Sequence, residues 1–149
     1  MKKVTTAFLC AVLLVVLVVP AYAQDNSNSY TRYIEYQEDG SYFVIEIIQA
    51  NTSSRSNTTS GTKSAMYYDS SNALIFTVDV TGTFTYNGTS AAADSAVSAV
   101  YIYDSRASFE NKGAYTSGAS AIGYANVKLN SHPIYKAVTL TCSKDGRLS

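Results

Sequence analysis

The stretch LIFTVDVTGTFTY, residues 74–86, places an apolar side chain at almost every second position. Successive residues of a β-strand point to opposite faces, so a period of two lines one face with core residues and leaves the other polar. Threonine fills most of the remaining positions, and Ile75 is the one apolar residue among them. Gly82 has inward parity, where a missing side chain indicates a bend, a bulge or close approach by another backbone. The stretch predicts a long strand whose even-numbered residues face the core.

Asn87 and Gly88 follow this strand and suit a two-residue type I′ turn, because both tolerate positive φ angles. Such a turn would fold the chain back and place Val78 opposite Val97. The Ala-Ala-Ala-Asp run at residues 91–94 has weak strand propensity, which leaves a bulged loop as the alternative. This part of the chain therefore predicts a second strand that pairs with the first.

The segment YIEYQEDGSYFVIEI, residues 33–47, predicts another hairpin around Asp39 and Gly40. A two-residue turn there would set Ile34 opposite Ile45, and a slip by one residue would scatter the apolar set. In this register Tyr36 faces Phe43 and Arg32 faces Ile47. The other face of the hairpin would then carry Tyr33, Glu35, Tyr42 and Glu46.

Further alternation predicts a hairpin that joins residues 66–68 to residue 74 across the turn formers 69–72. Apolar rows recur at 121–129 and 134–142, and Lys136 interrupts the second row. We therefore expect residues 30–149 to form one all-β domain, an antiparallel β-sandwich of seven or eight strands, with a flattened β-barrel as the alternative. The polar residues 51–60 are too poor in apolar groups to pack and are expected to form a loop.

Residues 1–23 have the features of a signal peptide. Lys2 and Lys3 precede an apolar run at 7–19, and Ala-Tyr-Ala at 21–23 supplies small residues for cleavage. The run is shorter than the roughly 20 residues that span a bilayer. We expect a secreted, extracellular protein of bacterial type, with no membrane association after cleavage and a disordered arm at residues 24–29.

The charge balance and the cysteines limit the possible partners and bonds. Removing Lys2 and Lys3 leaves nine basic against eleven acidic residues without a basic cluster, so no nucleic acid partner is expected. Cys10 leaves with the leader, and Cys142 is then a free thiol that cannot form an internal disulfide. Its inward parity predicts a small buried hydrophobic side chain.

Catalytic and metal-binding signals are sparse. His132 is the only histidine and precedes Pro133, which favours an extended loop between two strands. No Gly-x-Ser-x-Gly motif occurs, and one His with one Cys is too few ligands for a zinc site. We expect no enzyme activity, no metal and no cofactor.

Glu35 and Glu46 offer the one alternative to this expectation. On one face of the predicted hairpin they would lie roughly 7–8 Å apart, close to the spacing of an inverting glycosidase pair. Tyr33 and Tyr42 would lie nearby and could stack on a sugar ring. Glycan hydrolysis is the remote alternative, because carboxylates are ordinary on a solvated sheet face and perturbed acids occupy formed clefts.

Tyrosine is abundant, with 13 residues, and it is the composition feature that points most directly to a function. Exposed tyrosine combines apolar area with a hydroxyl group, which suits contact with glycans or proteins. We therefore expect an extracellular binding or interaction module for a cell-surface glycan or protein, with Tyr33, Tyr42, Glu35 and Glu46 as candidate ligand-binding residues. The alternative is a structural secreted protein that self-associates through an edge strand. The sequence leaves the oligomeric state open.

The segments TVDVTGTFTYNG and VTLTCSKDGRLS resemble a family of small uncharacterised secreted proteins of Gram-positive bacteria. The resemblance is best over residues 66–149. It implies a secreted β-rich domain and no particular activity. In the family a cysteine often follows the Asn-Gly turn and could pair with the one in the Leu-Thr-Cys segment, whereas this chain has alanines at 91–93.

Overall fold

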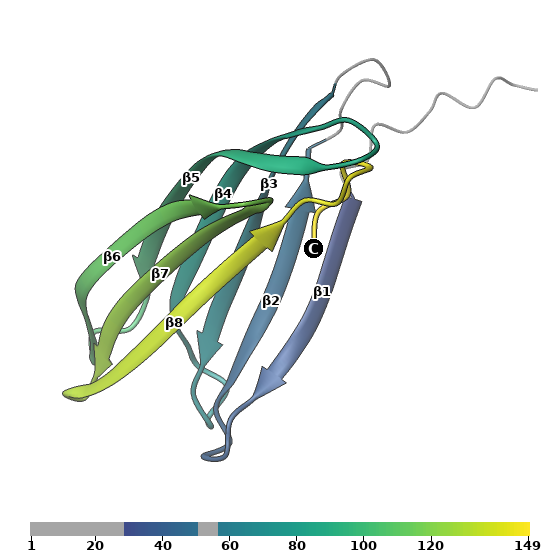
Figure 1. Cartoon of the computed structure of the whole chain (residues 1–149). Coiled ribbons are helices and arrows are strands. Elements are labelled where there is room, and N and C mark those ends of the chain that lie inside the picture. The colour runs from purple at the N-terminus through teal and green to yellow at the C-terminus, as the bar shows by residue number, and fades with distance from the viewer. Residues whose placement is uncertain (1–28, 51–56) are drawn as a thin grey trace, which may run out of the picture.

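The computed structural model describes residues 29–50 and 57–149, and these fold into eight antiparallel strands without a helix. The expected leader, the arm up to residue 28 and residues 51–56 lie outside the described residues. One sheet has the order β1-β2-β3-β4-β5 and the other β6-β7-β8 (Figure 1). The strands are β1 Ser29–Tyr36, β2 Tyr42–Gln49, β3 Thr58–Tyr68, β4 Leu74–Tyr86, β5 Ala91–Ile102, β6 Ala107–Ser117, β7 Ser120–Leu129 and β8 His132–Thr141.

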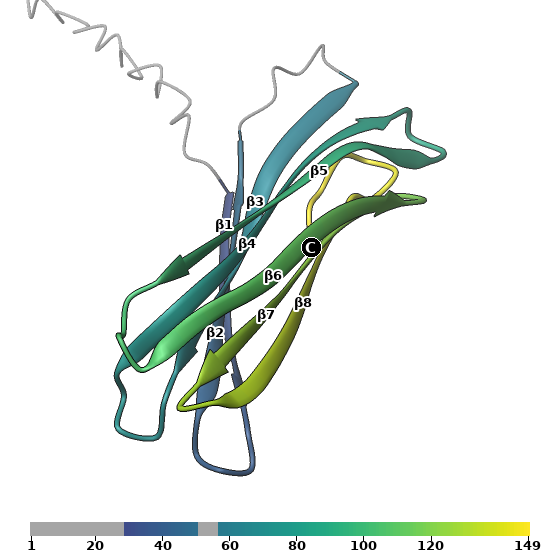
Figure 2. The same cartoon turned by 90° about the vertical axis from the view of Figure 1, so that its left-hand side faces the viewer.

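The two sheets pack face to face as a sandwich, which confirms the predicted fold class. The smaller sheet covers β3, β4 and β5, while β1 and β2 extend beyond it (Figures 1 and 2). At one margin β5 and β6 lie side by side, and the Nζ atom of Lys112 on β6 donates to the Ser98 carbonyl of β5 at 3.0 Å. Over the described ranges the sheets stay separate at the other margin, so the flattened barrel does not form.

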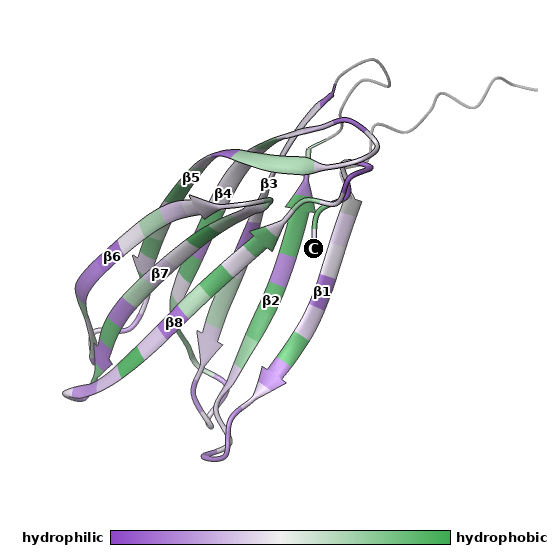
Figure 3. Cartoon of the chain, viewed as in Figure 1, coloured by the Kyte–Doolittle hydropathy of each residue, from purple (hydrophilic) through white to green (hydrophobic). Residues whose placement is uncertain are grey.

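The core lies between the sheets and follows the alternation of β4. Phe76, Val78, Val80 and Phe84 are each 0% exposed, as the sequence predicts. The facing sheet contributes Val127 and other small or branched side chains, and Figure 3 shows the same alternation of hydropathy along β7 and β8. Burial of this apolar surface is the main source of stability for a domain whose described cysteine is free.

Ile75 and Gly82 interrupt the pattern of β4 for different reasons. A register shift between Tyr67 and Tyr68 leaves Ile75 unpaired in a β-bulge, and the bulge turns its side chain into the core, where it is 0% exposed. At Gly82 a Cβ atom would lie 2.7 Å from the Cβ atom of Ala121 and 2.7 Å from the ring of Phe84. Close approach is therefore the explanation for Gly82, although side chains approach it rather than another backbone.

The predicted register of the first hairpin is wrong by one residue. Ile34 pairs with Val44 instead of Ile45, and residues 37–41 form a longer loop. Gly40 has a φ of 83°, and the Asp39 carboxylate accepts hydrogen bonds from the backbone N–H and the hydroxyl of Ser41. These interactions favour a turn followed by a bulge over a two-residue turn. Tyr36 consequently faces Tyr42 and Arg32 faces Glu46.

The predicted β4–β5 register is also wrong. Residues 87–90 form a four-residue loop, in which the Asn87 side chain accepts from the backbone N–H groups of Thr89 and Ser90. A bulge at Asp94 then adds a further shift, but residues 91–93 pair with β4, so the 91–94 run belongs to strand β5 and does not form the bulged loop of the alternative. Val78 therefore pairs with Val100, and Val97 points outward with 63% exposure.

Three further segments differ from expectation. Residues 58–60, expected in a loop, begin β3, and Ser29 begins β1. His132 begins β8 directly after a tight turn in which Asn130 and Ser131 both have positive φ, so it does not lie in an extended loop. Alternation does not indicate β6, whose residues are mostly exposed on both faces and whose pairing is bulged.

The segment after β8 folds back along that strand. Thr141 and Ser149 exchange two backbone hydrogen bonds of 2.9 Å, and Cys142 bridges to Leu148. Gln49 of β2 fixes this segment, because its side chain donates to the Gly146 carbonyl at 2.6 Å and accepts from the Leu148 N–H at 3.1 Å. Leu148 packs against the core at the open margin. Within the described ranges, the structure contains no helix with the length and apolarity that a membrane crossing requires.

Candidate functional site

The four candidate residues are divided between two faces of the large sheet. Residues directly opposite in an antiparallel pair share a face, and Glu35 pairs with buried Phe43 whereas Glu46 pairs with Arg32. Tyr33 and Glu35 thus belong to the inner face, and Tyr42 and Glu46 belong to the outer one. The prediction that both glutamates share a face is wrong, because it rested on the two-residue turn.

Each glutamate has its own cationic partner. The Glu35 Oε2 atom lies 2.5 Å from the Nζ atom of Lys136 on β8. The Glu46 Oε1 atom accepts from the Tyr30 hydroxyl at 2.6 Å and lies 3.5 Å from the Arg32 Nε atom. With the sheet between them, the two carboxylates cannot flank one glycosidic bond, so this pair offers no glycosidase geometry.

An aromatic row crosses the outer face near one end of the large sheet. Tyr36, Tyr42 and Tyr68 lie opposite one another in the strand register. The Tyr42 and Tyr68 rings are stacked, with centroids 5.0 Å apart and planes 6° apart, and the Tyr36 ring is tilted against Tyr42 at 5.8 Å. The Tyr42 hydroxyl donates to the Asn72 side chain at 3.1 Å. Tyr36 is 74% exposed and presents most of its ring to solvent.

An apolar row lies beside the aromatic row. Val44 is 2% exposed, although the small sheet packs on the opposite face, because Ile34 and Met66 flank it on the neighbouring strands. Ile34 is 46% exposed. Together these two rows form what we term the outer patch. Its members are Ile34, Tyr36, Tyr42, Val44, Met66 and Tyr68.

A charged row borders the outer patch. It contains the ion pair of Arg32 with Glu46, followed on β3 and β4 by Ser64 and Asp79. Burial raises the pKa of the Asp79 carboxyl, and a hydrogen bond from Ser64 opposes this shift. The Asp79 Oδ1 atom is buried without a hydrogen-bond partner among the described residues. The outer face therefore combines an apolar centre with a polar margin.

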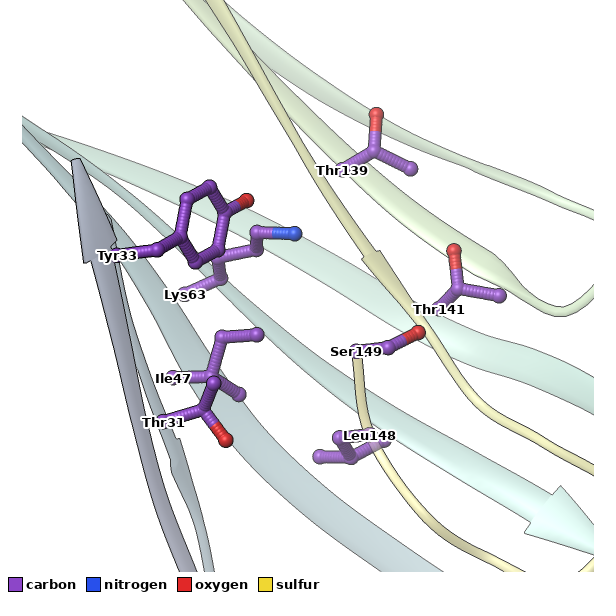
Figure 4. A pocket seen from close by; sticks show the side chains of 8 residues that line it. All are labelled: Thr31, Tyr33, Ile47, Lys63, Thr139, Thr141, Leu148 and Ser149. Atoms are coloured by element: carbon purple, nitrogen blue, oxygen red, sulfur yellow. The ribbon is translucent and has the colours of Figure 1, made fainter. Parts of the chain in front are cut away.

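The inner face is open where β1 and β2 extend beyond the small sheet. A cleft of about 450 Å³ lies there between β1–β3, β8 and the segment after β8 (Figure 4). Tyr33, Ile47, Lys63 and Leu148 project toward this space, whereas the Thr139 and Thr141 side chains lie on the far side of β8. The lining residues are Thr31, Tyr33, Ile47, Lys63, Thr139, Thr141, Leu148 and Ser149.

Lys63 is the cation of this cleft. It lies between Ile47 and Val80 in the strand register, so its stem is on the core face and the residue is half-buried. Its Nζ atom is 5.9 Å from the centre of the Tyr33 ring. Burial lowers the pKa of the Lys63 ammonium, while the Glu35 carboxylate raises it and Lys136 lowers it. Burial likewise raises the pKa of the Tyr33 hydroxyl.

The ion pair of Lys136 and Glu35 lies at one end of the cleft. A second hollow of about 220 Å³ contains this pair and shares Tyr33, Lys63 and Thr139 with the first. The Lys136 side chain is only 16% exposed, and its Nζ atom lies 4.2 Å from the centre of the Phe43 ring. Lys136 could have been singled out from the sequence, because it interrupts a row of apolar residues. Lys63 could not, because its sequence neighbours are small polar residues without an alternating pattern.

The other residues singled out from the sequence lie elsewhere. His132 is exposed at the β7–β8 turn, with its Nδ1 atom 3.1 Å from the Asn130 carbonyl oxygen. Across residues 29–50 and 57–149, no group of three or more His, Cys, Asp or Glu side chains has the arrangement of a metal site. Cys142 is a free thiol with 3% exposure, as predicted, and burial raises its pKa.

No family model, curated protein or solved structure matches this chain. The resemblance to small secreted proteins of Gram-positive bacteria therefore stays a prediction. The site must be interpreted from its own geometry.

Proposed function

We propose that this protein is an extracellular interaction module that binds a protein partner through the outer patch. The observation that supports this function best is the contiguity of the aromatic and apolar rows on a sheet face that the second sheet does not cover. Contiguous exposed patches of this kind mark interaction surfaces, whereas scattered apolar residues do not.

The composition of the outer face matches that of protein interfaces. Tyrosine and methionine are enriched at the centre of such interfaces, and charged residues gather at the rim. Here Ile34 and Tyr36 are the exposed apolar and aromatic members of the patch, and Arg32 and Glu46 form its charged border. Tyrosine also loses little conformational entropy on contact, because only two side-chain torsions become fixed.

A protein fits this surface better than a glycan. Sugar recognition by stacking needs an aromatic ring whose face is free. The facing sides of Tyr42 and Tyr68 cover each other, so these two residues offer mainly ring edges and hydroxyl groups, and Tyr36 is the one ring of the row that is largely free. Ring edges beside Ile34 and Val44 suit apolar side chains and carbonyl groups of a protein.

Self-association through an edge strand is less well supported. The β1 edge carries Arg32 and Glu35, and β8 carries Lys136 and Pro133. Charged residues and proline are the usual protection of exposed edges against strand pairing. Three tyrosines gather in the outer patch, and this cluster favours a specific partner, although other exposed tyrosines such as Tyr103, Tyr115 and Tyr135 lie elsewhere on the surface.

The test uses the mature chain, residues 24–149, labelled with a fluorophore and applied to intact cells of its source. We expect binding that protease treatment of the cells removes and periodate oxidation of their glycans leaves intact. The double variant Ile34→Ser with Tyr36→Ser should bind about 10-fold or more weakly, the loss expected at an aromatic hot spot.

The matched control is Tyr115→Ser with Tyr135→Ser, because these residues are 53% and 61% exposed on β6 and β8, away from the outer patch. It should bind as the wild type does. Loss of binding after periodate alone would contradict a protein partner. A dimer in sedimentation experiments that only the outer-patch variant dissociates would instead identify a second copy as the occupant.

A further inference from the structure

A half-buried ammonium group without a matching anion faces the inner cleft. Glu35 is the carboxylate that influences Lys63, but its Oε2 atom is bound to Lys136. Among residues 29–50 and 57–149, no carboxylate lies within 4.0 Å of the Lys63 Nζ atom. Because Lys136 and Glu35 neutralise each other, the side chains of the cleft retain one positive charge.

Holding this charge on the core face is unfavourable for folding alone. A desolvated ammonium without an ion-pair partner destabilises the folded state, and an unbranched apolar side chain would fit between Ile47 and Val80 without that penalty. An unpaired, half-buried lysine therefore favours a role in binding over one in stability.

The other cleft residues define what an occupant would look like. The Tyr33 hydroxyl and the Lys63 ammonium project together toward β8 (Figure 4). These groups can donate hydrogen bonds to one negatively charged group. Ile47 and Leu148 line another part of the cleft and supply an apolar surface. A volume of about 450 Å³ is within the range of small-molecule sites.

We infer that the inner cleft binds a small amphipathic carboxylate, with its carboxylate against Lys63 and its apolar body against Ile47 and Leu148. The ammonium of Lys63, which has no ion-pair partner among the described residues, matches a ligand with one negative charge. The binding site is separate from the outer patch and does not depend on the function proposed for that face. A free organic acid and the carboxyl terminus of a peptide share this chemistry.

The experiment titrates the mature chain, labelled with ¹⁵N, and follows its amide resonances. Octanoate represents the free acid, acetyl-alanyl-leucine represents a peptide terminus, and octanamide is the neutral isostere of octanoate. We expect octanoate to bind saturably with a Kd of about 1 mM or tighter. The shifted resonances should be those of Lys63, Thr139 and Thr141. Octanamide should bind about 10-fold more weakly, because it lacks the charge-assisted contact. Tighter binding of the peptide would support the same site with a peptide terminus as its ligand.

Lys63→Met removes the charge and keeps an unbranched side chain of similar length. The control is Lys128→Met, which removes a lysine charge from the exposed ion pair with Glu110. Lys63→Met should weaken octanoate binding about 10-fold or more and raise the melting temperature of the ligand-free protein, while the control should leave affinity unchanged. Equal affinity for octanoate and octanamide, undiminished binding by Lys63→Met, or no saturation would overturn the inference. A lower melting temperature of Lys63→Met would count against it too, because the ammonium would then be satisfied within the protein.

Discussion

The Nζ atom of Lys136 lies 2.5 Å from the Oε2 atom of Glu35, and this ion pair joins β8 to β1 across the open margin of the sandwich. Lys136 is the more buried partner, with 16% side-chain exposure against 40% for Glu35. The pair therefore spans a gap that no backbone hydrogen bond between the two strands closes within the described residues. Its two members respond differently to substitution.

We predict that Glu35→Gln lowers the free energy of unfolding by about 1–2 kcal/mol, because it leaves the ammonium of Lys136 without its anion in a partly buried site. Lys136→Met should cost less, since Glu35 can remain hydrated. Denaturant unfolding of both single variants and the double variant measures their coupling. If the changes in the free energy of unfolding of the two single variants add up to that of the double variant, the ion pair contributes nothing to stability. Glu110→Gln, which breaks the exposed ion pair with Lys128, is the reference for the effect of a surface pair.

We predict that Phe76→Ala destabilises the domain by about 3–5 kcal/mol, the usual effect of emptying a fully buried aromatic site. Phe76 is 0% exposed and contacts the rings of Phe43 and Tyr67 at centroid distances of 6.2 Å and 5.1 Å. Val97→Ala on the exposed face should change stability by less than about 0.5 kcal/mol. Urea unfolding followed by tyrosine fluorescence compares the two variants.

Acidification tests the network that joins the β3–β4 loop to the β5–β6 loop. The Asp69 carboxylate accepts from the Ser71 hydroxyl, the Ala73 N–H and Arg106, and these bonds hold its pKa well below the ordinary 3.8. A carboxyl group whose pKa is lower in the folded state than in the unfolded state stabilises the protein fully at a pH above the unfolded-state pKa. This stabilisation is lost as the pH falls from the unfolded-state pKa toward the folded-state pKa. Asp69→Asn should therefore melt a few degrees lower at pH 7, and the difference should shrink below pH 3.8.

The control for this prediction is Asp145→Asn, since Asp145 is exposed and pairs with neighbouring Lys144 on the surface. Its melting temperature should follow the wild type at every pH. A difference between Asp69→Asn and the wild type that stays constant between pH 7 and pH 2 would exclude ionisation of Asp69 as the cause.

Cys142 should react with a thiol reagent only after unfolding. Its side chain is 3% exposed, and burial raises its pKa, so little reactive thiolate forms at neutral pH. The mature chain should migrate identically on electrophoresis with and without reductant. Rapid labelling of the native protein, or a reductant-sensitive dimer, would contradict this expectation. Cys142→Ala provides the unlabelled reference.

Alternation alone was sufficient to predict the inward faces of β4, β7 and β8. Each of these strands packs one face on the core, so burial leaves a period of two in the sequence. The predicted partner residues failed at both hairpins for a different reason. Side-chain hydrogen bonds of Asp39 and Asn87 stabilise longer loops, and their sequences also permit two-residue turns. One residue of loop length then changes every opposite pair.

The same error determined how much of the site could be predicted. Tyr33 and Tyr42 were correctly assigned to strands, but their faces depended on the register and proved opposite. The inner cleft depends on how far the small sheet extends over the large one. That offset is set by packing between strands distant in sequence, such as β3 and β8, and no local pattern encodes it.

The position of Ser149 has a practical consequence for handling the protein. Ser149 pairs with Thr141 and lines the inner cleft, so any residue attached after it would begin its path inside that hollow. A carboxyl-terminal purification tag would compete with added compounds and could imitate or mask their signals. A removable amino-terminal tag keeps the hollow free, and a matched pair of fusions would reveal how strongly an attached peptide occupies it.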